Sequence, residues 1–230
     1  MNSSKKSILN SNFTYLAAFV LPVIMMMALY YTRGIFPWGN ECYLRSDMYH
    51  QYAPFFSELW HKIRNGESLT YSWNIGMGTN FTSLFAYYLA SPSNWFVALF
   101  PQKYTIEIMN AFIILKIAGS SLSLTYYLTK HNNNKHVIAA IFGMFYGMSG
   151  FIAAYSWNIM WLDCVILIPL IMLGLERLVN ENRCIFYCIT LGLCIFTNYY
   201  IAIMVCLSVV IYYVVPVSYT HLTLPTILLV

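Results

Sequence analysis

The sequence contains an uncharged, mostly apolar run near the N-terminus, FTYLAAFVLPVIMMMALYY (residues 13–31), which is typical of a membrane-spanning helix. A helix of these 19 residues, at about 1.5 Å per residue, nearly matches a hydrocarbon core of about 30 Å. No small-residue cleavage site of the A-x-A type follows the run. We therefore predict an uncleaved membrane span rather than a signal peptide.

The composition of the whole chain agrees with a membrane protein. Hydrophobic residues make up 60% of the sequence and charged residues 9%, against roughly 25% charged in a soluble domain. So few charges exclude a soluble, disordered or coiled-coil protein. The net charge of +4 is too small and too scattered for a nucleic-acid binder. Every cysteine except Cys42 lies in an apolar stretch. No nucleotide-binding or metal-binding motif is present, so the sequence identifies no cofactor and leaves a divalent metal open.

Further apolar runs predict further spans. Residues 108–129 fit one span. Residues 137–175 are too long for a single crossing and fit a helical hairpin with a break near residues 155–158. Residues 185–215 fit two short helices with a corner at residues 198–200. We predict an all-α polytopic membrane protein with about six spans.

Basic residues in the short loops predict the orientation. In this arrangement they all fall on one side of the membrane, which is then cytoplasmic. The N-terminus is expected inside a bacterial plasma membrane, and residues 33–107 are expected to form a large first external loop. The basic residues are Lys5, Lys6, Lys130, Lys135, Arg177 and Arg183.

The first part of this loop has the pattern of an interfacial helix. Ser46 is a suitable N-cap, apolar residues then recur at helical spacing, and Gly66 is a suitable end. Pro54 is expected to bend the helix or to begin a second segment. The other face is polar, so we expect the helix to lie in the membrane interface. That face carries Asp47, His50, Gln51, Glu58 and His61.

The second part of the loop contains two glycines. Gly76 and Gly78 permit a tight turn or a close approach to a ligand. A phosphate-binding loop would require a strand before it and a helix after it in a βαβ unit, so a nucleotide site is not expected. Residues 85–100 are apolar but interrupted, which favours an interfacial or re-entrant helix over a span.

Several motifs in this order resemble the N-terminal part of the bacterial YfhO family. They are SDMYHQY (46–52), YSWNIGMG (71–78), YYLASP (87–92) and WLD (161–163) before an apolar helix ending in LER (175–177). The resemblance covers roughly residues 10–215. The family is similar to the GT-C class of glycosyltransferases, which transfer a sugar from a polyprenyl-phosphate carrier to an external acceptor. Its members are implicated in decorating teichoic acids.

The resemblance implies roles for residues of the loop. The GT-C pattern places an essential acidic residue in the first external loop, and the carboxylate inside the matching motif is Asp47. It would act as general base on an acceptor hydroxyl. His50 and Gln51 would orient Asp47 or the sugar, Arg45 would bind the carrier phosphate, and Asn74 would contact the substrate. The alternative for Asp47 is an ordinary residue in the first turn of a helix.

Asp163 is a separate candidate because it lies within an apolar stretch. A carboxylate at such a position costs about 2.5–3.5 kcal/mol on insertion scales, so it indicates a substrate-binding role or a partner. Lys116, inside the 108–129 run, is the candidate partner. The alternative is a hydrated carboxylate at the end of a helix.

The last residues of the chain break the membrane pattern. Residues 217–230 resemble a translated sequencing-library adapter, so we predict a non-native tail after an N-terminal GT-C-like portion, residues 1–216. His221 is for that reason not a candidate site residue. A fragment of this kind would be inactive alone.

Two other functions remain open from the sequence. A transporter or flippase of lipid-linked precursors would also use short paired helices and intramembrane charges. A noncatalytic envelope scaffold would need no particular carboxylate in the loop. In every case the lipid bilayer is a partner. The transferase in addition requires a polyprenyl-phosphate sugar donor and a cell-envelope polymer as acceptor.

Overall fold

The computed structural model describes residues 2–132 and 137–227, and the side chains of residues 12–132 and 137–214. Helices dominate, and one two-stranded antiparallel hairpin pairs Tyr71 with Asn80 and Ser72 with Thr79. The strands are β1 (Tyr71–Ser72) and β2 (Thr79–Asn80). The helices are α1 (Asn2–Thr32), η1 (Met48–Tyr52), α2 (Ala53–Asn65), α3 (Phe81–Leu84), η2 (Phe85–Leu89), η3 (Pro92–Leu99), η4 (Gln102–Tyr104), α4 (Thr105–His131), α5 (Val137–Gly147), α6 (Gly150–Tyr155), α7 (Leu162–Glu181), α8 (Ile185–Thr197) and α9 (Tyr199–Ile227).

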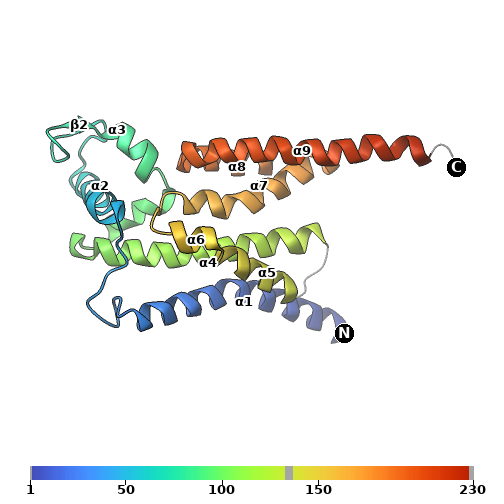
Figure 1. Ribbon diagram of the computed structural model, residues 1–230, viewed down its shortest axis with the longest axis horizontal. Coiled ribbons are helices and arrows are strands. Elements are labelled where there is room, and N and C mark those ends of the chain that lie inside the picture. Colours follow the sequence, from blue (N-terminus) through green and yellow to red (C-terminus); the bar gives the residue numbers. More distant parts are fainter. Residues whose placement is uncertain (1, 133–136, 228–230) are drawn as a thin grey trace.

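The long helices lie side by side with their axes along one direction (Figure 1). Helix α4 is central and packs against α1, α5 and α7, while α8 packs against α7 and α9. The segment between α1 and α4 gathers at one end of this bundle, which we call the α2 end (Figure 1).

Three helical stretches are long and apolar enough to cross a membrane within the described ranges: Asn12–Thr32, Gln102–His131 and Val137–Tyr155. Helix α7 carries four charged residues, and the described apolar part of α9 is short, as is α8. The membrane-protein class and its helical character are confirmed, and the count of about six spans stays a prediction.

Close contact between α4 and α5 depends on two glycines one turn apart. A Cβ atom at Gly143 would collide with the Thr125 hydroxyl and the Ser121 carbonyl oxygen, and one at Gly147 would lie 2.9 Å from the Ile117 carbonyl oxygen. Small residues at this spacing let two membrane helices approach closely.

The predicted break after α6 is present. Helix α6 ends at Tyr155 and α7 begins at Leu162, so residues 156–161 cross between them at the α2 end. We call residues 156–161 the crossing segment. The corner predicted at residues 198–200 is present at Asn198 alone, because α8 ends at Thr197 and α9 begins at Tyr199.

A helix is present where the interfacial helix is predicted, although it starts at a different residue, and its place in the membrane interface stays a prediction. Pro54 lies in the first turn of α2, and Gly66 ends that helix in a left-handed conformation. Ser46 does not cap the helix: its φ of 47° turns the chain, and the helical turns of η1 begin one residue later, with Asp47 at the N-cap position. Glu58 is buried rather than on an exposed polar face.

Some of the predictions concern residues outside the described part of the chain. The side chains of Lys5, Lys6 and Lys135, used for the orientation, lie outside the described residues, as do those of 217–230. The orientation and the tail stay predictions.

Candidate functional site

Asp47 stands at the start of η1, at the α2 end of the bundle. Its carboxylate is exposed, and it makes no hydrogen bond or ion pair with any residue whose side chain the structure describes. A carboxylate in this state is free to accept a proton or a hydrogen bond from a ligand.

The negative charge of Asp47 acts on two nearby tyrosines, Tyr52 and Tyr88. Burial, together with Asp47, raises the pKa of Tyr52 well above its ordinary value, and burial, Tyr87 and Asp47 raise the pKa of Tyr88. Both hydroxyls therefore stay protonated at neutral pH. The ring of Tyr52 stacks on Trp157 with centroids 6.2 Å apart, which connects η1 with the crossing segment.

His50 and Gln51 are exposed on η1 beside Asp47. The ring of His50 lies edge-on against Tyr49, with 5.2 Å between centroids. Neither side chain bonds to Asp47 within the described part of the chain, so the structure does not make either one its orienting partner. Their contact with a sugar stays a prediction.

Arg45 lines a groove of about 550 Å³ at the same end of the molecule. A second arginine, Arg33, lines it too, and the sequence analysis did not single that residue out. Both arginines are exposed, and no described acidic group lies within ion-pair distance of either. The two guanidinium groups outnumber the one carboxylate of the groove, Glu41, so the charge of the groove favours an anionic ligand.

The remaining walls of the groove are mostly apolar. They come from α1, α4, α5, α6 and the segment after α1, with Ser156 of the crossing segment and Glu41 as polar members. The lining residues besides the arginines are Met26, Leu29, Ile35, Glu41, Cys42, Tyr43, Ile117, Gly147, Met148, Ile152, Ala153 and Ser156. A groove lined by two arginines and by mostly apolar side chains suits an amphiphilic anion.

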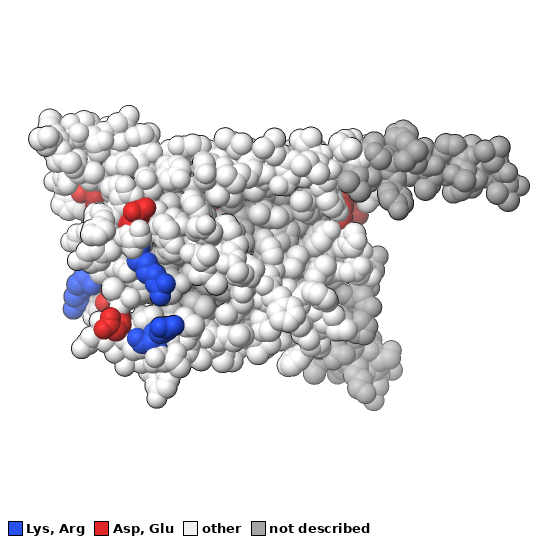
Figure 2. Space-filling view, in the orientation of Figure 1, with Lys and Arg blue, Asp and Glu red and all other residues white. Residues whose placement is uncertain are grey.

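Charged side chains gather at this end. On the face shown in Figure 2, most of the blue and red atoms lie over the α2 end, and the long middle of the bundle is white. This distribution fits a bundle whose middle lies in lipid and whose α2 end meets water.

Asp163 has the partner that the sequence suggested. Its Oδ2 lies 2.7 Å from Nζ of Lys116, and the same ammonium donates to the carbonyl oxygen of Ile159 over 3.2 Å. Lys116 is 4% exposed. The pair joins α4 to the first turn of α7, where the helix dipole also favours a carboxylate.

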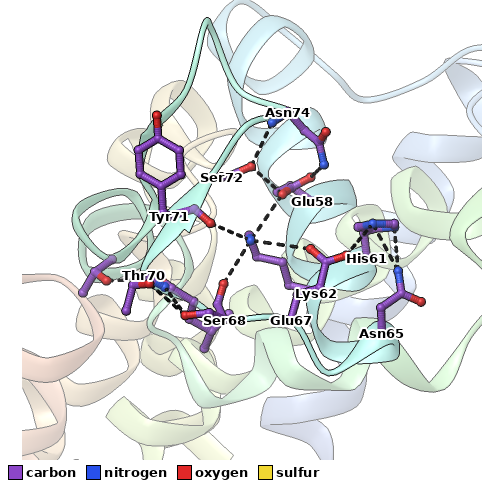
Figure 3. Close-up of polar contacts among 12 residues, drawn as sticks. Glu58, His61, Lys62, Asn65, Glu67, Ser68, Thr70, Tyr71, Ser72 and Asn74 are labelled. Atoms are coloured by element: carbon purple, nitrogen blue, oxygen red, sulfur yellow. Dashed lines mark hydrogen bonds and ion pairs between the residues drawn. The ribbon is translucent and has the colours of Figure 1, made fainter.

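Asn74 belongs to a polar network between the hairpin and α2 (Figure 3). Its amide nitrogen donates to Oε2 of Glu58 over 3.0 Å, and the hydroxyl of Ser72 donates to Oε1 over 2.6 Å. Lys62 lies 3.7 Å from Glu58 and donates to the carbonyl oxygen of Tyr71 over 2.8 Å. The side-chain nitrogen of Asn74 is thus already hydrogen-bonded, so a substrate contact, which stays a prediction, would use its amide oxygen.

The tip of the hairpin confirms the expected turn. Gly76 and Gly78 both have positive φ, 60° and 102°. No group of three or more His, Cys, Asp or Glu side chains suited to a metal ion occurs among the described residues.

Comparison with known proteins points to one family. The family model described as bacterial membrane protein YfhO matches residues 17–227. No curated protein and no solved structure matches the chain.

Proposed function

Since the chain belongs to the YfhO family of bacterial membrane proteins, we propose that it is part of a membrane glycosyltransferase. The enzyme would move a sugar from a polyprenyl-phosphate carrier to a cell-envelope polymer such as teichoic acid. The α2 end would face the outside of the cell and the N-terminus the cytoplasm.

The observation that carries this proposal is the groove with Arg33 and Arg45. Its two unpaired cations suit a phosphate, and its apolar walls suit the first isoprene units of a lipid chain. Arg45 lies only two residues before Asp47, so a lipid phosphate in the groove would bring its sugar towards that carboxylate.

The chemistry follows from these two features. Asp47 would take the proton of an acceptor hydroxyl while the hydroxyl oxygen attacks the anomeric carbon of the sugar. The bond between that carbon and the phosphate oxygen breaks, and its electron pair leaves with the carrier phosphate, which Arg33 and Arg45 hold. His50, Gln51 and Asn74 would contact the sugar or the acceptor.

The test is Asp47→Asn in the full-length protein. Asparagine keeps the size of the side chain and removes the base, so we expect sugar transfer to fall by at least about 100-fold. Transfer is measured in membranes with a labelled lipid-linked sugar. Glu67→Gln is the control: this carboxylate of the same segment is paired with His61 and Lys62 outside the groove, and its loss should keep activity. Normal transfer by Asp47→Asn at normal protein level would remove Asp47 from the mechanism.

The same groove also fits a transporter of lipid-linked precursors, because recognition of a lipid phosphate does not require transfer chemistry. Proteoliposomes loaded with labelled carrier separate the two functions. Movement of the carrier across the bilayer without sugar transfer, unaffected by Asp47→Asn, would favour the transporter.

A further inference from the structure

The crossing segment, residues 156–161, is shared by the two parts of the candidate site. Ser156 lines the groove with Arg33 and Arg45. Two residues on, Asn158 contacts η1, the turn that follows Asp47. A displacement of this segment would therefore change the groove and the surroundings of Asp47 together.

Two hydrogen bonds tie the crossing segment to the chain around Arg45 and Asp47. The hydroxyls of Tyr43 and Ser156 lie 2.6 Å apart. The hydroxyl of Tyr52 donates to Oδ1 of Asn158 over 2.8 Å. Tyr43 precedes Arg45 by two residues and Tyr52 follows Asp47 by five, so the two bonds bracket the candidate site residues.

A third tie holds the crossing segment to the bundle. Lys116 of α4 donates to the carbonyl oxygen of Ile159 and forms the ion pair with Asp163, which comes shortly after the segment ends. The side chains of Lys116 and Asp163 are 5% and 14% exposed. A charge pair among apolar helices is costly to form, and the lone charge left by removing one partner is costlier still.

We propose that Lys116 and Asp163 are positioning residues for the candidate site. They fix the crossing segment on α4, and through Tyr43 and Tyr52 this segment holds the chain around Arg45 and Asp47 in place. The effect on sugar transfer rests on the proposed function, whereas the structural role stands independently of it. Asp163 thereby acquires a role that differs from direct substrate contact.

The structural part is tested without any activity. Ser156→Cys, combined with Cys42→Ser because Cys42 lines the same groove, reports on the crossing segment. The thiol makes a weaker hydrogen bond to Tyr43 than the serine hydroxyl does, so every further variant is compared with this background and not with the wild-type protein. The rate of its modification by N-ethylmaleimide is followed by mass spectrometry of the labelled peptide in the full chain. Ser156 is 2% exposed, so slow labelling is expected in this background. Adding Lys116→Met should make labelling about tenfold faster, because the segment loses its tie to α4.

Two further variants separate positioning from folding. Lys116→Met leaves Asp163 buried without its partner, which can impair folding by itself. Lys116→Met with Asp163→Asn carries no unpaired charge, and it should fold while the reporter thiol at position 156 still labels fast. Lys116→Arg keeps both the charge and the donors and should label slowly.

A matched control uses the same two helices at the other end. His131 of α4 lies 2.9 Å from Glu176 of α7. His131→Asn weakens this contact, and it should leave the labelling of the reporter unchanged. Fast labelling in this control would mean that any loosening of α4 against α7 exposes the groove, which overturns a specific role for Lys116 and Asp163.

Kinetics test the functional part. The double variant of Lys116 and Asp163 should raise KM for the lipid-linked sugar about tenfold and lower kcat as well, since a misplaced groove and a misplaced base both cost rate. Unchanged labelling and unchanged kinetics overturn the proposal. So does an inactive Asp163→Asn with slow labelling, which indicates direct substrate contact. If the wild-type full-length protein transfers no sugar, the proposed function fails while the labelling result still decides the positioning.

Discussion

Two charged regions at the α2 end differ in how their charges are used. In the network between α2 and the hairpin, Glu58 and Lys62 are 7% and 3% exposed, and each has several partners (Figure 3). In the groove, Arg33 and Arg45 are exposed and have no ion-pair partner among the described residues.

The difference separates a structural role from a binding role. A buried ion pair must be fully hydrogen-bonded to offset the cost of its desolvation. Glu58 and Lys62 meet that condition through hydrogen bonds to the hairpin segment, and these bonds fix the hairpin on α2. Two exposed arginines without ion-pair partners contribute little to the stability of the fold. They are available to a phosphate, which is why we place the ligand in the groove and not at the hairpin.

The strongest test of this contrast is Lys62→Met. The change leaves the carboxylate of Glu58 buried without its cation, so we expect a loss of about 3–5 kcal/mol in the free energy of unfolding. Unfolding in mixed micelles with increasing sodium dodecyl sulfate measures it. The neutral pair Lys62→Met with Glu58→Gln should recover part of the loss. A cost below about 1 kcal/mol would show that the network is hydrated and not a structural clamp.

The converse test removes the cations of the groove. Arg33→Gln with Arg45→Gln should weaken binding of a short-chain polyprenyl phosphate by at least about 100-fold, because hydrogen bonds to charged groups contribute about 1.5–3 kcal/mol each. Stability should change by less than about 0.5 kcal/mol. The corresponding polyprenol, which lacks the phosphate, should bind both proteins equally.

Arg64→Gln provides the matched control for the groove. Arg64 belongs to α2, where its guanidinium lies 5.9 Å from the ring centre of Trp60. Removal of this cation should not alter phosphate binding. An equal loss in the control would show that binding depends on the net charge of the α2 end and not on the groove.

The parts of the fold that depend on local pattern could be predicted from the sequence. Apolar runs indicate α1 and α4, and Pro54 and Gly66 indicate the limits of α2. The predicted start of η1 is wrong because the positive φ of Ser46 follows from how the chain turns, which side-chain capping preference does not reveal.

The site was less predictable because its parts are distant in sequence. The pairing of Lys116 with Asp163 was suggested by the cost of charges in apolar helices, and it is confirmed. The sequence does not indicate a role for Arg33, because an arginine next to the end of an apolar run is common at the end of a membrane helix. Only the folded chain brings it into one groove with Arg45. Helical spacing places Glu58 on the polar face of the helix, but it does not show that the hairpin covers this residue.

The smallest effect is expected at the tip of the hairpin, where two glycines allow a matched comparison. Gly78 has a φ of 102°, and a Cβ atom there would collide with the hydroxyl of Tyr71; Gly76 has a φ of 60° and nothing within 4 Å of such an atom. Gly78→Ala should therefore cost about 1–3 kcal/mol of stability, and Gly76→Ala about 1 kcal/mol. The same unfolding titration measures both.

Neither glycine variant should change the binding of polyprenyl phosphate, because the tip takes no part in the groove. If Gly78→Ala weakens phosphate binding while Gly76→Ala does not, the hairpin and the groove are coupled. In that case the buried charges of Glu58 and Lys62 would serve the ligand as well as the fold, and the division between the two regions would no longer hold.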